Sequence, residues 1–246
     1  MSDIAVILPA AGAGQRFGGA VKKPFAQLDG RPIFIRAIEL FINRSDVCQT
    51  ILTVAPDDYD VVREKYAANL MFMGIKLVKG GSERWQSVRA ALEALDDAVK
   101  FVAIHDAVRP CLHDDWIDHV FNEARKTGAA ILAAPLVGTI KRVAQSRMID
   151  ATVPRAGLYE AQTPQVFARK VIVDAYAKLP ANATPTDDAE VVEKSGHAVA
   201  VVPCDRRNIK ITEPGDLALA AAILKTIDRK PKSDTGPMGA FGEAQW

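Results

Sequence analysis

Residues 6–24 read VILPAAGAGQRFGGAVKKP, an apolar run followed by a loop of small residues and then by basic ones. A loop without bulky side chains lets backbone N–H groups close around an anion, and glycine supplies the dihedral angles that such a loop needs. Arginine offers phosphate a planar fork of donors, and lysine offers it a point charge. This order of a strand, a bare loop, Arg16 and then lysine therefore predicts a site for a triphosphate.

Two common phosphate-loop patterns do not fit this stretch. The Walker pattern requires Lys and Ser/Thr after its second glycine, where this chain has Ala20 and Val21. The dinucleotide fingerprint requires a third glycine where the chain has Phe17, and no acidic residue follows a second strand at the expected distance. The remaining pattern, AAGxGxRFG followed by KP, resembles the signature loop of nucleotidyltransferases that activate sugars and alcohols. The alternative is a glycine-rich turn flanked by solvated basic residues.

Composition limits the kind of protein that the chain can be. It has 246 residues, 49% of them hydrophobic and 25% charged, which is typical of a soluble globular protein. A net charge of +1 gives no basic field for nucleic acid, and no apolar run approaches membrane-spanning length. The 3 cysteines lack metal-ligand spacing and indicate reduced thiols, and strand-like sequence begins too early for a signal peptide. We expect a cytoplasmic protein that binds neither nucleic acid nor a membrane.

Strand and helix patterns alternate along the chain. Apolar runs at 4–8, 50–54, 75–78, 101–104, 129–135 and 199–202 predict strands, and helical patterns cover 31–44, 116–126, 169–178 and 214–224. This alternation predicts an α/β fold, Rossmann-like, with a mostly parallel sheet flanked by helices. Two β-prone runs at 139–143 and 148–153 predict an inserted β-hairpin arm at about 138–156, and 163–165 predict a rigid turn. Residues 1–228 then form a single domain, followed by a disordered Gly/Pro-rich tail at 229–246.

Asp106 is the candidate metal ligand, because it follows the apolar run 101–104 at the strand end where open α/β sheets place their ligand chemistry. A carboxylate repels a triphosphate unless a divalent cation lies between them, and Mg²⁺ favours one or two carboxylates plus phosphate oxygens. The alternative is an acid that caps the turn toward Arg109. His105 is expected to support this turn. Thr186 is the expected N-cap of a further helix, and Asp187 and Asp188 in its first turn are explained by the helix dipole, although either is also open as a second metal ligand.

The segment GGSERWQSV, residues 80–88, predicts a second group of polar residues at a helix start. Ser82 is the expected N-cap, and Arg84 and Ser87 share one helix face because they lie three residues apart. From periodicity alone the segment is a capped surface helix. The other interpretation is that Gly81, Arg84 and Ser87 border a bound nucleotide.

Seven motifs in order make the resemblance specific. They are PAAGAGQRFG, GGSERWQSV, HDAVRPC, APLVGTIKR, TVPRAGLYEAQTPQVF, TDDAEVVEKSG and NIKITEPGDLALA, spread over residues 4–225. Together they resemble the 2-C-methyl-D-erythritol 4-phosphate cytidylyltransferase family of the non-mevalonate isoprenoid pathway. The family often has Pro-Lys-Gln where this chain has Lys22-Lys23-Pro24, and the spacing from Arg16 favours Lys23 as the phosphate lysine.

The resemblance implies roles for individual residues. Nucleotide binding is implied for Ala10, Ala11, Gly12, Ala13, Gly14, Gly81, Ser82, Arg84 and Ser87. Arg16, Lys23 and Lys210 would be catalytic cations, and Asp106 would hold Mg²⁺. The substrate phosphate would be bound by Arg109, Thr139, Arg155 and Thr163, with Thr139 and Arg155 reaching the neighbouring subunit's site in a homodimer formed through the arm.

The implied reaction joins CTP and methylerythritol phosphate into a CDP-alcohol and pyrophosphate. A cytidylyltransferase for another polyol phosphate, such as ribitol 5-phosphate, would share the nucleotide loop and differ in the arm. A non-catalytic nucleotide-binding protein on the same fold is an alternative of another class. The presence of Arg16, Lys23, Asp106 and Lys210 argues against it.

Overall fold

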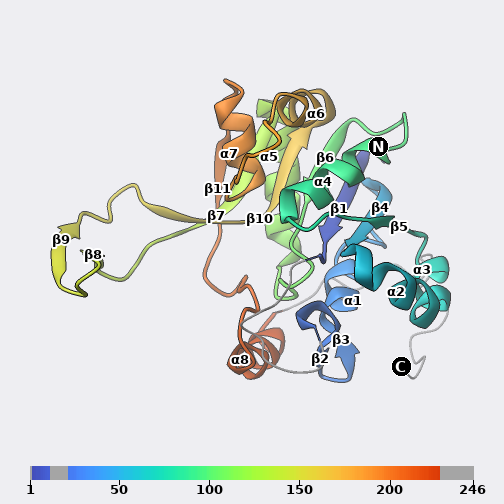
Figure 1. Cartoon of the computed structure of the whole chain (residues 1–246), viewed down its shortest axis with the longest axis horizontal. Coiled ribbons are helices and arrows are strands. Elements are labelled where there is room, and N and C mark those ends of the chain that lie inside the picture. Colours follow the sequence, from blue (N-terminus) through green and yellow to red (C-terminus); the bar gives the residue numbers. More distant parts are fainter. Residues whose placement is uncertain (1, 12–21, 228–246) are drawn as a thin grey trace.

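A seven-stranded sheet forms the centre of the protein, in a computed structural model that describes residues 2–11 and 22–227. The strand order is β11-β7-β10-β6-β1-β4-β5, and β10 alone among these seven runs antiparallel to its neighbours. Helices cover both faces (Figure 1). The expected α/β fold with a mostly parallel sheet is confirmed. The strands are β1 (Ile4–Pro9), β4 (Val47–Val54), β5 (Ile75–Lys79), β6 (Phe101–Ile104), β7 (Ala129–Pro135), β10 (Tyr159–Ala168) and β11 (Ala200–Pro203).

Eight α-helices and two 3₁₀ turns occur within the described residues. Glycine ends the long helix α5, because Gly128 adopts the left-handed conformation at its C-terminus. The α-helices are α1 (Ile33–Ile38), α2 (Tyr59–Lys65), α3 (Ala67–Phe72), α4 (Arg84–Glu93), α5 (Asp114–Thr127), α6 (Arg169–Ala177), α7 (Asp188–Lys194) and α8 (Gly215–Leu224). The 3₁₀ turns are η1 (Lys23–Phe25) and η2 (Pro56–Asp58), and a small sheet pairs β2 (Gln27–Leu28) with β3 (Arg31–Pro32).

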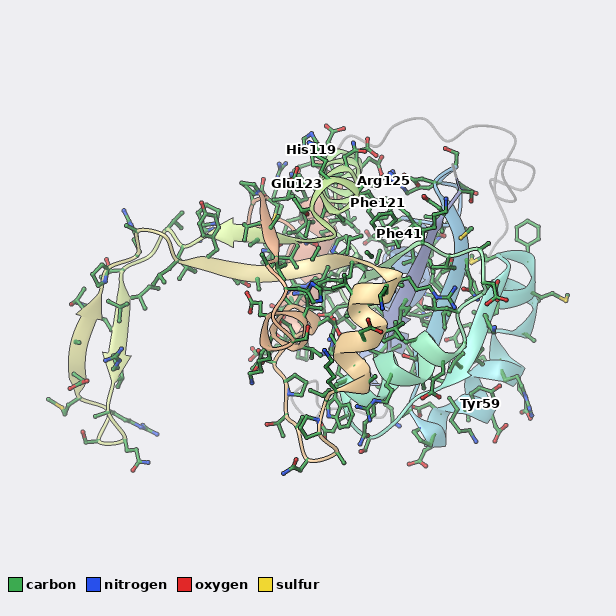
Figure 2. The ribbon with its side chains drawn as sticks, turned by 90° about the horizontal axis from the view of Figure 1, so that it is seen from above. Phe41, Tyr59, His119, Phe121, Glu123 and Arg125 are labelled. Carbon is green, nitrogen blue, oxygen red and sulfur yellow. The ribbon has the colours of Figure 1, made fainter. Side chains whose placement is uncertain are left out.

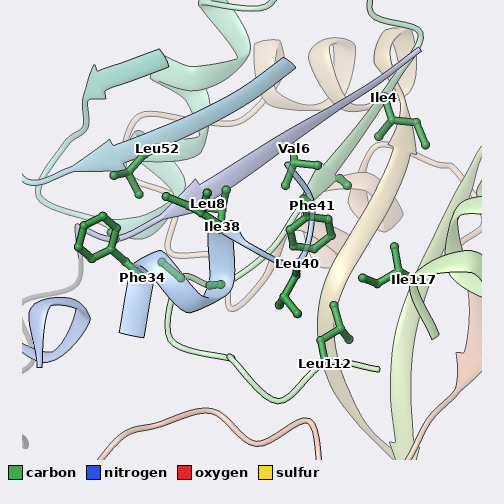
Figure 3. Packing of buried hydrophobic residues seen from close by; sticks show 14 of the residues in the cluster. Ile4, Val6, Leu8, Phe34, Ile38, Leu40, Phe41, Leu52, Leu112 and Ile117 are labelled. Atoms are coloured by element: carbon green, nitrogen blue, oxygen red, sulfur yellow. The ribbon is translucent and has the colours of Figure 1, made fainter. Parts of the chain in front are cut away.

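Strand β1 divides the core into two layers. Ile4, Val6 and Leu8 belong to one buried cluster, and Ala5 and Ile7 belong to another, because successive side chains of a strand point to opposite faces. The first cluster packs under α1, α2, α3 and α5, and the second under α4, α6 and α7. Figure 3 shows Val6 and Leu8 with Phe34, Ile38 and Phe41 in the first layer. This burial on both faces explains why the strand is apolar without alternation.

The hairpin arm is a separate two-stranded sheet that joins β8 (Ile140–Val143) to β9 (Ile149–Val153). Both strands agree with the predicted β-prone runs to within one residue. Figures 1 and 2 show the arm projecting from the body of the subunit. Several of its apolar side chains are exposed, including those of Val143, Met148 and Ile149.

Two predicted elements are corrected by the structure. Residues 163–165 are not a turn but lie inside strand β10, and Pro164 falls where the pairing with β7 is irregular between Ala161 and Gln165. Proline lacks the N–H that a regular ladder needs, so the sequence indicated a turn, whereas a strand tolerates proline at such an irregularity. The helix predicted for 31–44 covers only Ile33–Ile38, because Arg31 and Pro32 pair as β3. Three-residue turns follow it, in which the N–H of Phe41 donates to the carbonyl of Ile38.

Some predictions fall outside the described residues. These are the loop residues Gly12, Ala13, Gly14 and Arg16, and the tail at 229–246. Within the described part of the chain, no helix combines the length and the apolar character that crossing a membrane requires.

Candidate active site

The ends of β1 and β6 and the middle of β10 bring the candidate residues together at one edge of the sheet. Ala10 and Ala11 follow β1, and the N–H of Ala10 donates to the carbonyl of Thr53 at 2.8 Å. Asp106 follows β6, and Thr163 reaches it from β10. This is the edge where open sheets place ligands, as the sequence predicted for Asp106.

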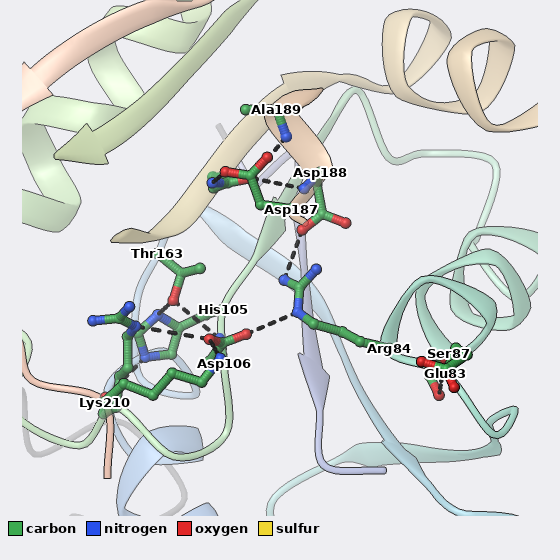
Figure 4. Close-up of polar contacts among 12 residues, drawn as sticks. Glu83, Arg84, Ser87, His105, Asp106, Thr163, Asp187, Asp188, Ala189 and Lys210 are labelled. Atoms are coloured by element: carbon green, nitrogen blue, oxygen red, sulfur yellow. Dashed lines mark hydrogen bonds and ion pairs between the residues drawn. The ribbon is translucent and has the colours of Figure 1, made fainter. Parts of the chain in front are cut away.

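Three cations surround the carboxylate of Asp106. Lys210 Nζ lies 2.8 Å from its Oδ2, Arg84 Nε lies 3.0 Å from its Oδ1, and Arg109 Nε lies 3.7 Å from its Oδ2. Figure 4 shows Arg84 and Lys210 approaching from opposite sides. Burial raises the pKa of Asp106, but the charges of Arg84, Lys210 and Arg109 outweigh burial and hold it well below its usual range. The carboxylate is therefore ionised throughout the physiological pH range.

Buried hydrogen bonds fix the turn that carries Asp106. The Thr163 hydroxyl accepts the backbone N–H of Asp106 at 3.0 Å and lies 3.1 Å from His105 Nδ1. The other ring nitrogen of His105, Nε2, lies 2.9 Å from the carbonyl of Arg109. A carbonyl only accepts, so Nε2 carries the proton and Nδ1 accepts from Thr163. Burial lowers the pKa of His105 to about 4, so the imidazole is neutral, and its role is to support the turn, as expected.

Arg109 and Lys210 are held by one loop between β11 and α8. Arg109 is buried, and its Nη1 donates to the carbonyl of Asn208 at 2.7 Å. The amide of Asn208 donates to the carbonyl of Thr163 at 2.9 Å, and the N–H of Ile211 donates to the carbonyl of Val108. These bonds fasten the loop to the turn after β6. They place Lys210, whose side chain is 39% exposed, at the solvent side of Asp106.

The start of α4 has a different cap from the predicted one. Glu83, not Ser82, is the N-cap, and it forms a capping box with Gln86. Ser82 donates instead to Gln86 Oε1 at 2.9 Å, since the longer Glu83 and Gln86 side chains satisfy the helix N-terminus reciprocally. The N–H of Gly81 donates to the buried hydroxyl of Ser87, and a Cβ on Gly81 would lie only 2.4 Å from the Gln86 side chain. Gly81 and Ser87 thus shape the turn from which Arg84 extends.

Asp188, which the sequence analysis explained by the helix dipole and left open as a second metal ligand, belongs to the site as a partner of Arg84. Its side chain is fully buried, and its Oδ2 lies 2.7 Å from Arg84 Nη2. The hydroxyl of Tyr176 donates to its Oδ1 at 2.6 Å. Tyr176 was not a candidate, because an apolar helix pattern indicates only a core position. The position of Asp188 within the TDDAEVVEKSG motif was the available signal.

The cap of α7 is also one residue later than expected. Asp187, rather than Thr186, is the N-cap, and its Oδ1 accepts the N–H of Glu190 at 2.8 Å. Thr186 is itself held by the Glu190 side chain, which reaches back to its N–H and hydroxyl. Asp187 Oδ2 accepts from the amide of Gln165 at 2.8 Å.

The remaining predicted residues lie on other elements of the chain. Lys22 pairs with Asp58 at 2.6 Å, whereas Lys23 begins η1. The N–H groups of Thr212 and Glu213 chiefly lower the pKa of Asp216, and the charge of Lys23 adds to this, which places Lys23 near the loop that carries Lys210. Thr139 and Arg155 are exposed on the projecting arm, where Arg155 Nη1 donates to the carbonyl of Val137.

Among residues 2–11 and 22–227, no group of at least 3 His, Cys, Asp or Glu side chains is placed to hold a metal ion. One ionised carboxylate, Asp106, is nevertheless the donor set that fits Mg²⁺ arriving with phosphate oxygens, because this ion commonly takes one or two carboxylates and keeps water.

A family model described as 2-C-methyl-D-erythritol 4-phosphate cytidylyltransferase matches residues 4–226 of the chain. A protein of that name from Rhodopirellula baltica is 45% identical over 234 residues, which cover 91% of this chain and 95% of the relative. Another from Solibacter usitatus is 38% identical over 233 residues, covering 90% of this chain and 96% of the relative.

Solved structures give the same result. The 4-diphosphocytidyl-2C-methyl-D-erythritol synthase of Anaerococcus prevotii superposes with a TM-score of 0.76 at 30% identity, covering 91% of this chain and 96% of that one. The 2-C-methyl-D-erythritol 4-phosphate cytidylyltransferase of Thermus thermophilus also superposes with a TM-score of 0.76, at 28% identity, covering 91% and 99% of the two chains.

Proposed function

The chain belongs to the 2-C-methyl-D-erythritol 4-phosphate cytidylyltransferase family, and we propose that it catalyses the reaction for which that family is named. CTP and 2-C-methyl-D-erythritol 4-phosphate would give 4-diphosphocytidyl-2-C-methyl-D-erythritol and pyrophosphate. The observation that carries the proposal, beside the family match over residues 4–226, is the cluster of Arg84, Arg109 and Lys210 around Asp106 at the strand ends. Such a cluster suits a reaction that brings two phosphorylated substrates together.

In this mechanism an oxygen of the alcohol phosphate attacks the α-phosphorus of CTP, and pyrophosphate leaves. A phosphate monoester is already nucleophilic, so the site needs no strong general base. The neutral His105, with both ring nitrogens hydrogen-bonded internally, agrees with this requirement. Catalysis then consists of positioning and of charge stabilisation by Lys210, Lys23 and Arg16.

Asp106 is the residue that would hold Mg²⁺ when the nucleotide binds. The ion would supply positive charge to the phosphate oxygens. The lysine at 2.8 Å and the arginine at 3.0 Å now balance the Asp106 carboxylate, and both side chains are partly exposed. Both cations are thus placed to pair with phosphate oxygens as well, while Asp106 would hold the ion.

Pyrophosphate release tests the proposal directly. The wild-type protein with CTP, Mg²⁺ and 2-C-methyl-D-erythritol 4-phosphate should release pyrophosphate, and ribitol 5-phosphate in its place should give far less. A pyrimidine site that hydrogen-bonds the exocyclic amine should also reject UTP and ATP, because an unmatched buried polar group is costly. Equal use of ribitol 5-phosphate, or of UTP or ATP, would overturn the substrate assignment.

Lysine variants locate the activity at this site. Lys210→Met should lower turnover on the order of 10²–10³-fold, as for other groups that stabilise transition-state charge. Lys126→Met removes a lysine whose side chain is 72% exposed on α5 and serves as the matched control. Similar activities of the two variants would remove Lys210 from the mechanism.

We also propose that the protein is a two-fold homodimer formed through the arm. An isolated two-stranded hairpin is only marginally stable, and the exposed Val143, Met148 and Ile149 give this one an apolar surface to bury. A second copy would cover that surface and receive Thr139 and Arg155 into its substrate site.

The three cysteines form no disulfide, which supports a cytoplasmic location.

Complementation between inactive variants tests the shared site. If Arg155 acts across the interface, a mixed dimer of Lys23→Ala and Arg155→Ala subunits has one site with both defects and one with none. Random pairing by co-expression should then restore about a quarter of wild-type activity. If Arg155 serves its own subunit, every site carries a defect. The absence of recovery in preparations with mixed dimers confirmed by mass would refute the shared site.

A further inference from the structure

A continuous chain of polar contacts runs from Asp106 into the core on the far side of Arg84. Arg84 Nε donates to Asp106 Oδ1 at 3.0 Å, and its Nη2 donates to Asp188 Oδ2 at 2.7 Å. The hydroxyl of Tyr176 donates to Asp188 Oδ1 at 2.6 Å. Figure 4 shows the guanidinium of Arg84 between the two carboxylates. Arg84 is thus divided between an acid at the site and an acid in the core.

The backbone around Asp188 is fixed before any substrate binds. The side-chain carbonyl of Gln165 accepts the N–H groups of Asp188 and Ala189 at 3.1 and 2.9 Å. The amide of the same Gln165 side chain donates to Asp187, the N-cap of α7. Asp188 is therefore held by strand β10, by the start of α7 and by Tyr176 of α6 at once. A carboxylate fixed in this way gives the guanidinium only one orientation in which both pairs form.

We infer that Asp188, oriented by the Tyr176 hydroxyl, is a positioning residue that keeps Arg84 in the orientation required for nucleotide binding. Arginine side chains have high rotamer entropy, so a second, buried anchor is needed to hold the guanidinium in one place. Without that anchor, Arg84 is free to turn both Nε and Nη2 onto Asp106, because a carboxylate accepts two parallel hydrogen bonds from one edge of an arginine. This inference rests on the proposed function, since the family resemblance implies that Arg84 binds the nucleotide.

A purely structural role makes a different prediction. A buried carboxylate needs a cation, so the pair could serve only to fasten α7 to α4. In that case its loss lowers stability and leaves the affinity for CTP unchanged. The chain contains a matched control: Arg44 bridges Asp46 and Asp118 at 2.8 and 2.7 Å. Asp46 directly precedes β4, so this second triad lies at the opposite edge of the sheet from Asp106.

The experiment uses Tyr176→Phe, which keeps the ring and removes the hydroxyl, so that the fold is disturbed as little as possible. CTP affinity is measured by calorimetry, and kcat and KM are measured for both substrates. We expect Tyr176→Phe to weaken CTP binding and to lower kcat/KM for CTP about tenfold, the effect of one hydrogen bond to a charged group. The KM for the alcohol phosphate should be unchanged. Asp118→Asn, the control, should bind CTP as the wild type does.

A double-mutant cycle with Arg84→Lys completes the test. Lysine keeps the charge but loses the fork, so Tyr176→Phe should have almost no further effect on CTP affinity in the Arg84→Lys background. Wild-type CTP affinity in Tyr176→Phe, or additive losses in the double variant, would overturn the inference, as would a lower melting temperature as the sole effect. Wild-type protein that binds CTP without releasing pyrophosphate would overturn the proposed function instead, and the binding cycle would still decide the role of Asp188.

Discussion

Replacement of Asp106 by asparagine removes one charge from among three cations and keeps the shape of the side chain. Breaking a buried ion pair by removing one partner typically costs about 3–5 kcal/mol. Lys210, 39% exposed, regains water, and Arg84 keeps Asp188, so the loss falls mainly on the buried Arg109. We therefore expect the lower end, about 3 kcal/mol. In a chain of 246 residues this corresponds to a melting temperature lower by roughly 6–12 °C.

Thermal unfolding with and without anions tests this calculation for Asp106→Asn. The three cations no longer have their carboxylate, so pyrophosphate or CTP without metal should stabilise the variant more than the wild type. Turnover should nevertheless fall by about 10²–10³-fold and require more Mg²⁺, because the ion loses its carboxylate. A variant with wild-type melting temperature would refute the electrostatic reasoning. Near-normal turnover and Mg²⁺ dependence would remove Asp106 from the mechanism.

Two further predictions concern the supports of the site. Burial lowers the pKa of His105 from 6.5 to about 4, so its contribution to stability is complete above pH 6.5 and is lost as the pH falls from 6.5 toward 4. Urea unfolding of His105→Asn should lack this part of the pH dependence, and an unchanged slope would contradict the assignment. Asp187→Ala should lower stability by about 1 kcal/mol through loss of the N-cap, while Asp187→Ser retains most of it. A large activity loss in a stable Asp187→Ser variant would instead indicate a metal ligand.

The central strands could be predicted because their evidence is local. Each is a short apolar run buried on both faces. In β1, successive side chains enter the two core layers in turn, so every position is apolar and the strand pattern is clear from the sequence. Strand β10 could not be predicted, since Thr163-Pro164-Gln165 has the local chemistry of a turn. Its pairing with β6 and β7 is formed by partners distant in the sequence. Local propensity therefore gave the wrong element there.

Some polar residues could be placed from the sequence and others could not. Asp106 could be placed from sequence, because a strand end fixes its position whatever side chains surround it. The N-caps were each one residue off: the sequence favoured Ser82 and Thr186, while the structure uses Glu83 and Asp187. Short polar neighbours compete for the same N–H groups, and only the final backbone geometry decides among them. The direction of the error is informative, since both observed caps are acids.

The site is a balance of charges rather than a set of independent contacts. Asp106 and Asp188 are two buried anions, and each is close to Arg84. A guanidinium shared by two carboxylates cannot be assigned from sequence, since the pairing joins residues 104 positions apart. The sharing of Arg84 between Asp106 and Asp188 also helps the site to bind a triphosphate. When a triphosphate enters, Lys210 can turn toward it, and Arg84 can offer it its remaining N–H donors while Asp188 keeps the guanidinium in place and the buried acid compensated. A site with a single acid would have to lose that pairing before it could bind its substrate.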